Sequence, residues 1–296
     1  MKQVIIILML LCCKMSSTHA QIFSSYSKGD SLLALKQYDA AIAEYKIILK
    51  DNNQGFKHVY YYNLACAYSL INQLDSSVEI LMRIPELTQN AEFIFDSDLS
   101  NLHLHRSWRT LIDMYEQNFI SENRLLPNFD IAFALSLMKE EGQSIRRLAN
   151  RKSSSLKHQD SIIEQWRFID SVNTSKLVNI IDRIGWPDVS KVGSKGAYNA
   201  FIILQHSNID FQKKYISLLR KAVEANKVSP IHLAYLEDRI LQLENKPQIY
   251  GTQIDVSNNE PKPYPVIEPE NLNKRRKSIG LEPIEEYLKS FKTNDY

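Results

Sequence analysis

The feature that most constrains the fold of this chain is a pattern of small and large residues that occurs twice between Ser25 and Leu87. The two copies have similar spacing, and Gly29 of the first aligns with Ala65 of the second, 36 positions later. The first copy consists of Gly29, Leu32, Tyr38, Ala41, Ile42 and Tyr45, and the second of Tyr61, Leu64, Ala65, Tyr68, Leu74, Val78 and Leu81. Small residues let two short antiparallel helices pack closely, so each copy predicts a helical hairpin.

This repeat resembles the tetratricopeptide family, whose period is about 34 residues. The second copy fits that family better than the first, in which Lys28 replaces an expected apolar residue. A helical stretch between Asp98 and Tyr115 would supply the cap that such an array needs at its end. We therefore expect a tetratricopeptide-like module over residues 21–118 that binds a protein or peptide, with a generic helical bundle as the alternative.

The amino terminus has the architecture of a secretory signal peptide. Lys2 is followed by an apolar run, Val4–Cys13, and a polar stretch that ends at Ala20. This run is too short to cross a bilayer, which takes about 20 residues, so no stable membrane span is expected. We predict that residues 1–20 are removed and that the protein is periplasmic or extracellular. Lipoprotein processing at Cys12 or Cys13 is the alternative, but the residues before these cysteines are too bulky for it.

Charge and cysteine content exclude some classes of protein. The chain has 36 basic and 34 acidic residues, and Lys2 and Lys14 lie in the predicted leader. The mature chain would then be neutral, which argues against a nucleic-acid partner or an anionic membrane surface. Cys66 would be its single cysteine, and its apolar neighbours on a predicted helix favour a role in the core.

From Pro127 onwards the pattern changes to longer amphipathic helices with clear stop signals. After Pro247 the period becomes two, and the stretch Gln248–Ile254 followed by Tyr264–Ile267 predicts a small β-hairpin. We expect residues 125–296 to form a mostly helical domain with this one hairpin. The fold class is then mainly α, with tetratricopeptide-like hairpins followed by a second helical domain.

Several motifs of this second domain resemble a bacterial family of unknown function that often follows tetratricopeptide-like repeats in exported proteins. In order they are Gly185-Trp186-Pro187, Val192-Gly193, Gln205-His206, Asp238-Arg239, Gln248-x-Tyr250-Gly251-Thr252-Gln253 and Arg276-x-x-Ile279-Gly280-Leu281. The resemblance spans Leu135 to Tyr287. One departure is that the family pattern Asp-Gln-x-x-Arg has Gly142 in place of the aspartate here. The resemblance implies no particular activity.

His206 is the first candidate for chemistry, because it ends an apolar predicted helix and an imidazole titrates near neutral pH. The alternative is that this histidine only caps the helix by bonding its last carbonyl groups. Asp238 and Tyr250 are its candidate catalytic partners. Asp238 and Arg239 could equally form a structural pair.

The stretch from Gln248 to Gln253 is unusual because amide, phenol and hydroxyl groups alternate around Gly251. Such groups recognise neutral polar ligands such as sugars or peptides, although they could equally tie the hairpin to the helices. The candidate ligand-binding residues are Gln205, Arg239, Gln248, Thr252, Gln253 and Arg276.

No metal site or cofactor is expected. His103 and His105 are two positions apart and no carboxylate or cysteine cluster completes a site, while the turn at Gly193 lacks the spacing of a phosphate-binding loop. Two functions therefore stay open. The chain is an exported binding protein with a ligand site in its second domain, or it is a cell-envelope hydrolase or transferase that uses His206 with Asp238 or Tyr250. Both require His206, Arg239 and Tyr250 to meet in one pocket.

Overall fold

The computed structural model describes residues 27–50, 57–89, 91–150, 156–256 and 260–292. The predicted signal peptide lies outside these ranges. The chain divides into two compact units between Leu125 and Leu126, and helices dominate both, which confirms the mainly α fold class. Within the ranges described, no helix combines the length and the hydrophobicity needed to cross a membrane.

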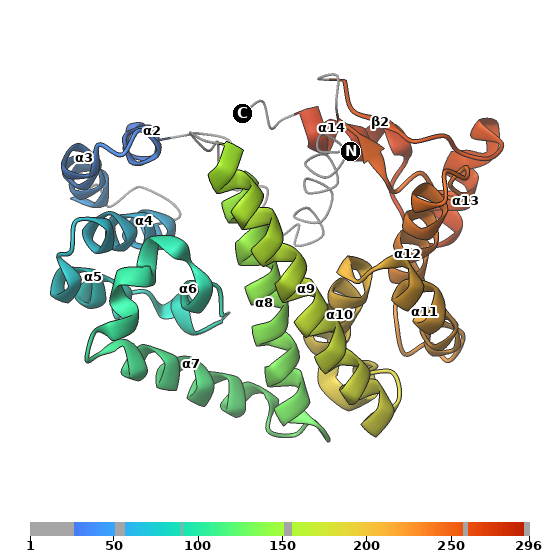
Figure 1. Cartoon of the computed structure of the whole chain (residues 1–296), viewed down its shortest axis with the longest axis horizontal. Coiled ribbons are helices and arrows are strands. Elements are labelled where there is room, and N and C mark those ends of the chain that lie inside the picture. Colours follow the sequence, from blue (N-terminus) through green and yellow to red (C-terminus); the bar gives the residue numbers. More distant parts are fainter. Residues whose placement is uncertain (1–26, 51–56, 90, 151–155, 257–259, 293–296) are drawn as a thin grey trace. The chain divides into compact units, whose positions relative to one another are not determined.

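The first unit begins with two pairs of helices (Figure 1). These are α2 (Lys28–Ala34), α3 (Tyr38–Lys50), α4 (Lys57–Leu70) and α5 (Leu74–Leu81), and each packs against the next along the chain. A capping box starts α2, because the Ser27 hydroxyl accepts from the Asp30 N–H while the Asp30 carboxylate accepts from the Ser27 N–H. The helical hairpins predicted from the repeat are present.

Gly29 and Tyr45 explain why the two helices of the first hairpin pack so closely against each other. A Cβ atom at position 29 would lie 2.6 Å from the buried Tyr45 ring, so only glycine leaves room for the tyrosine. The Tyr45 hydroxyl donates to Asp30 at 2.7 Å, and Asn63 of α4 donates to the same carboxylate oxygen at 2.9 Å. Asp30 therefore joins three helices.

The rest of the first unit consists of short helical turns and one longer helix. These elements are η3 (Pro85–Gln89), α6 (Glu92–Phe95), η4 (Ser97–Leu104) and α7 (Trp108–Asn123). Phe93 packs edge-to-face on Trp108 and Tyr115, with ring centroids 5.8 and 6.4 Å apart. Cys66, in α4, is buried as expected.

The second unit is built on long helices. They are α8 (Phe129–Asn150), α9 (Leu156–Ile184), α10 (Val189–His206), α11 (Ile209–Glu224) and α12 (Pro230–Leu243). Helix α8 packs against both α9 and α10, and α12 packs against α10 and α11, so segments far apart in the sequence become neighbours (Figure 1).

Helix α10 contains a break at Gly193. Asp188 caps the start of the helix, but Gly193 has φ 71° and ψ 172°, a conformation that is essentially restricted to glycine. The helix resumes after this residue and runs to His206, so the glycine sets the direction of the segment that carries the histidine.

A short β element and two helices complete the unit. Strand β1 (Ile254–Asp255) pairs antiparallel with β2 (Lys262–Pro263), and η5 (Pro269–Asn271), α13 (Leu272–Ser278) and α14 (Ile284–Lys292) follow. A small antiparallel hairpin is thus present, but it is shorter than predicted and its second strand precedes the predicted Tyr264–Ile267. Residues 248–253 form a loop and not the strand expected from their alternation, because their backbone N–H groups bend around Asp238 and Gly251 has φ 62°.

Candidate functional site

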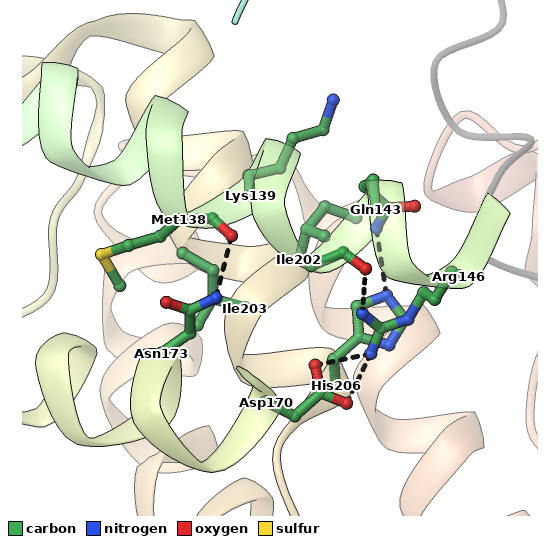
Figure 2. Close-up of a pocket in the computed structure, with 10 residues that line it drawn as sticks. Met138, Lys139, Gln143, Arg146, Asp170, Asn173, Ile202, Ile203 and His206 are labelled. Atoms are coloured by element: carbon green, nitrogen blue, oxygen red, sulfur yellow. Dashed lines mark hydrogen bonds and ion pairs between the residues drawn. The ribbon is translucent and has the colours of Figure 1, made fainter. Parts of the chain in front are cut away.

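A small opening in the second unit is lined by polar and apolar side chains of α8, α9 and α10 (Figure 2). Its empty space, including the part open to solvent, is about 230 Å³. The lining residues are Met138, Lys139, Gly142, Gln143, Arg146, Asp170, Asn173, Ile202, Ile203 and His206. We call this place the α8–α10 opening.

Helix periodicity places three residues of α8 at this opening. Gly142, Gln143 and Arg146 stand at relative positions 0, +1 and +4, which share one side of a helix. Arg146 is only 1% exposed, and its Nη1 donates to the Gly142 carbonyl oxygen at 2.5 Å. Its guanidinium group also lies over the Trp166 ring, 4.9 Å from the centroid, which favours a buried cation.

Asp170 of α9 is the counter-ion of Arg146. Nη2 of Arg146 donates to both carboxylate oxygens, at 2.7 and 2.6 Å. Burial raises the pKa of Asp170 above its ordinary value, and the charge and hydrogen bonds of Arg146 oppose this change. One turn further along α9, Asn173 donates to the Met138 carbonyl oxygen at 3.0 Å.

His206 closes the opening from the end of α10. Its Nε2 lies 3.3 Å from the amide nitrogen of Gln143, which as oriented donates, so the imidazole proton is on Nδ1. Burial lowers the pKa of His206 well below 6.5, and the positive charges of Arg146 and Arg239 lower it further. The imidazole is therefore neutral at pH 7, and the hydrogen bond described for its ring is with the Gln143 side chain and not with the helix carbonyl groups expected of a simple cap.

Arg239 of α12 acts electrostatically on the same group of residues. Its charge lowers the pKa of His206 and also that of Asp170. Arg239 itself does not line the opening. Tyr250 does not line the opening either, and burial raises its pKa, with the negative charges of Glu237 and Asp238 acting in the same direction.

Asp238 lies elsewhere and is fully buried. Its carboxylate accepts from the backbone N–H groups of Ile249, Tyr250 and Thr252 at 2.7, 3.1 and 2.9 Å. Burial raises its pKa, and these N–H groups oppose the change by stabilising the charged form. This geometry supports a structural role, in which Asp238 holds the loop 248–253 against α12.

The remaining candidates hold the same loop together. The Gln248 side chain donates to the Gln253 and Tyr264 carbonyl oxygens and accepts from the Gln253 N–H. Arg276 is fully buried and donates to the carbonyl oxygens of Tyr250 and Glu282 at 2.8 and 2.7 Å. These contacts bind the loop to α13.

Thr252 and Gln205 are also buried among protein groups. The Thr252 hydroxyl accepts from the Gln253 side chain at 3.1 Å, and its carbonyl oxygen accepts from the Tyr287 hydroxyl at 3.1 Å. The Gln205 carbonyl oxygen accepts from the Gln212 side chain at 3.0 Å. None of Gln205, Gln248, Thr252, Gln253 and Arg276 lines the α8–α10 opening.

Five polar residues of the opening were not among the sequence candidates: Lys139, Gln143, Arg146, Asp170 and Asn173. The spacing of apolar residues along the predicted helices does indicate two of them. Arg146 continues the buried stripe of Leu135 and Met138 at helical spacing, and Asp170 lies four residues after Trp166 on α9. Charged residues inside an apolar stripe are costly to bury and therefore informative.

The donor set gives no indication of a metal ion. In the part of the chain that the structure describes, no three His, Cys, Asp or Glu residues are grouped so that they could hold one. The opening presents one carboxylate, one imidazole, one guanidinium, one ammonium and two amides, which suit hydrogen bonding to a polar organic group.

The fold and this opening define a helical domain with a polar site buried between long helices. Residues 129–295 match a family described as "Family of unknown function (DUF6624)", which covers more than half of the chain, and the protein belongs to this family. The resemblance to such a family is thereby confirmed for the second domain. No curated protein and no solved structure matches the chain. The family match does not extend to the repeats of the first unit, whose tetratricopeptide character stays a prediction.

Proposed function

We propose that the second domain is a binding domain that takes a small polar ligand at the α8–α10 opening. The observation that carries this proposal is the meeting of Gln143, Arg146, Asp170 and His206 from three different helices at one opening. Burying a charged pair and two further polar groups costs free energy that apolar residues would not cost. A ligand that uses these groups accounts for their presence.

Two buried atoms at the opening support a ligand over a purely structural network. Among the residues that the structure describes, Arg146 Nε and Asn173 Oδ1 have no hydrogen-bond partner. An unsatisfied buried donor or acceptor costs about 1–3 kcal/mol. A bound molecule with both donors and acceptors could satisfy such groups.

The wider proposal is that the protein works outside the cytoplasm, with residues 1–20 as signal peptide. Its first unit would bind a protein or peptide on the surface formed by the stacked pairs α2–α3 and α4–α5. Support comes from the leader sequence, the repeat of small residues and the sequential packing of these helices. The two units would then join partner recognition to ligand binding.

The test is a thermal-shift screen of the mature chain against amino acids, short peptides, sugars and cell-envelope fragments. We expect at least one compound to raise the melting temperature of the wild type and not that of His206→Gln, because binding stabilises the folded state. Tyr250→Phe is the matched control, since Tyr250 does not line the opening, and it should respond as the wild type does. The proposal fails if every stabilising compound acts equally on His206→Gln.

A hydrolase or transferase is the second candidate, because a neutral imidazole at an opening can accept a proton. Asp238 is engaged by backbone N–H groups, so the partners that the geometry offers His206 are Gln143 and the Arg146–Asp170 pair. Gln143 already occupies Nε2, which favours binding over proton transfer. Turnover of a glycan or peptide substrate that is lost in His206→Gln would establish the enzyme instead.

A further inference from the structure

The α8–α10 opening admits only a small group. Its empty space of about 230 Å³ includes the part open to solvent, and the enclosed part has room for about one water molecule. A ligand can therefore place one polar atom inside while the rest of it stays at the mouth. The hydrogen-bonding groups that line this space decide which atom that is.

His206 offers this atom a hydrogen-bond donor. Burial and the charge of Arg146 lower the pKa of His206, so the ring stays neutral, and a neutral imidazole donates through one nitrogen and accepts through the other. Nε2 lies 3.3 Å from the side-chain amide nitrogen of Gln143, which donates, so Nε2 accepts and Nδ1 carries the proton. The group that Gln143 leaves for a ligand is therefore the donor Nδ1–H.

Asp170 offers the same atom a hydrogen-bond acceptor. Its side chain is 19% exposed, whereas that of Arg146, which donates to both of its carboxylate oxygens, is 1% exposed. The carboxylate is thus the end of the ion pair that reaches the opening, and its oxygens have further acceptor sites. Lys139 does not compete for them, because its ammonium group binds Glu140 at 2.5 Å and its side chain points away from the other labelled residues (Figure 2).

An oxygen atom that both accepts and donates suits these two groups, and a hydroxyl group carries such an atom. An ammonium group only donates, so it would leave Nδ1–H without an acceptor. A carboxylate only accepts, and Asp170 repels it. We propose that the opening receives a hydroxyl group of a neutral ligand, and that Gln143 prepares His206 for it by holding the imidazole proton on Nδ1. This inference rests on the proposed binding function and adds the ligand class and a positioning residue.

The first experiment determines the tautomer of His206 by NMR of the full chain with isotope-labelled histidine, and His206→Gln assigns the signals. The wild type should carry the proton on Nδ1 alone. Gln143→Met keeps a side chain of similar length that cannot donate, so a tautomer with the proton on Nε2 should appear. A wild-type proton on Nε2, or an unchanged tautomer in Gln143→Met, would overturn the role of Gln143.

The second experiment titrates the same protein with ethanol, ethylammonium chloride and sodium acetate at constant ionic strength, and follows the His206 ring signals. Probes of this size bind with dissociation constants of about 1 mM or weaker, so high concentrations are needed. Ethanol should shift the signals saturably. Each charged probe should bind about tenfold more weakly, because it can form only one of the two hydrogen bonds. This preference should diminish in Gln143→Met and persist in the control Tyr250→Phe.

The outcomes separate the two proposals. If the ligand screen finds a compound that needs His206 but ethanol gives no saturable shift, the hydroxyl inference is wrong while the binding function stands. The same holds if either charged probe binds as tightly as ethanol. If neither the screen nor any probe acts on His206, the binding function itself is wrong.

Discussion

Two buried charged residues of the second unit show how a structural group differs from a candidate binding group. Asp238 and Arg146 are both almost fully buried. Both oxygens of Asp238 accept from backbone N–H groups, so its hydrogen-bonding capacity is used within the chain. Arg146 has Nε without a partner among the described residues and lies at an opening. The unused donors, and not burial or charge, identify the group that is available to a ligand.

Acid should destabilise the protein through its buried histidines. His232 of α12 stacks on Phe201, with ring centroids 4.5 Å apart, and burial lowers its pKa to about 4. The unfolded chain, with an ordinary value of about 6.5, then binds more protons than the folded chain below that pH. The stability contribution is present above pH 6.5 and is lost as the pH falls towards 4.

The variant His232→Phe isolates this contribution, because phenylalanine keeps the aromatic stack and cannot take up a proton. The free energy of unfolding is measured with urea at pH 7, 6 and 5. Between pH 7 and pH 5 it should fall by about 2 kcal/mol less in the variant than in the wild type. The comparison removes the effect of Asp170 and Asp238, whose raised pKa values act in the opposite direction. Equal losses in both proteins would contradict the prediction.

At the scale of elements, local sequence patterns predict the helices but not the loop 248–253, which depends on a long-range contact. The small residues of the repeat, such as Gly29, and the serine at position 229 before Pro230 predicted helices that the structure contains. The alternation from Gln248 to Gln253 predicted a strand, but Asp238, ten residues earlier, binds the backbone of this segment and turns it into a loop. A local period carries no information about such a contact.

The candidate site was predictable only in part, for a related reason. Of His206, Arg239 and Tyr250, only His206 lines the opening, and Tyr250 belongs to the loop held by Asp238. Arg146 and Asp170 meet because α8 packs on α9, and their separation of 24 residues along the chain gives no direct sign of this pair. Only their positions on buried helix stripes indicated that they are unusual.

The break in α10 gives a prediction for an element. Gly193→Ala should lower the free energy of unfolding by about 1–3 kcal/mol, since the observed dihedral angles suit glycine almost exclusively. The new Cβ atom would also lie 3.1 Å from Leu126 Cδ1. Urea unfolding of the mature chain measures the change.

Gly280→Ala is the matched control for this variant. Gly280 also has a positive φ, of 83°, but no heavy atom lies within 4 Å of a Cβ built on it. Gly280→Ala should therefore lower the free energy of unfolding by less than Gly193→Ala does. The steric part of the explanation would be refuted if the two variants lost the same stability.

At the scale of the whole molecule, each unit has its own buried core. In the first unit Ala41, Tyr45 and Leu81 are fully buried, and in the second Ala200, Phe201 and Leu236 are. The division between the units falls in the connection from α7 to α8. Cores that are complete within each unit predict independent folding.

A fragment of residues 126–296 should therefore fold by itself. We expect circular dichroism to show a helical spectrum and a cooperative thermal transition. A fragment without a cooperative transition would show that the second unit depends on the first.

The manner in which Asp238 holds residues 249 and 250 has an evolutionary consequence. The contacts are made to main-chain N–H groups, which every amino acid except proline provides. Natural variants can therefore exchange Ile249 and Tyr250 freely without releasing the loop, while a proline at either place would detach it. Many substitutions should therefore be tolerated at positions 249 and 250, and few at Asp238.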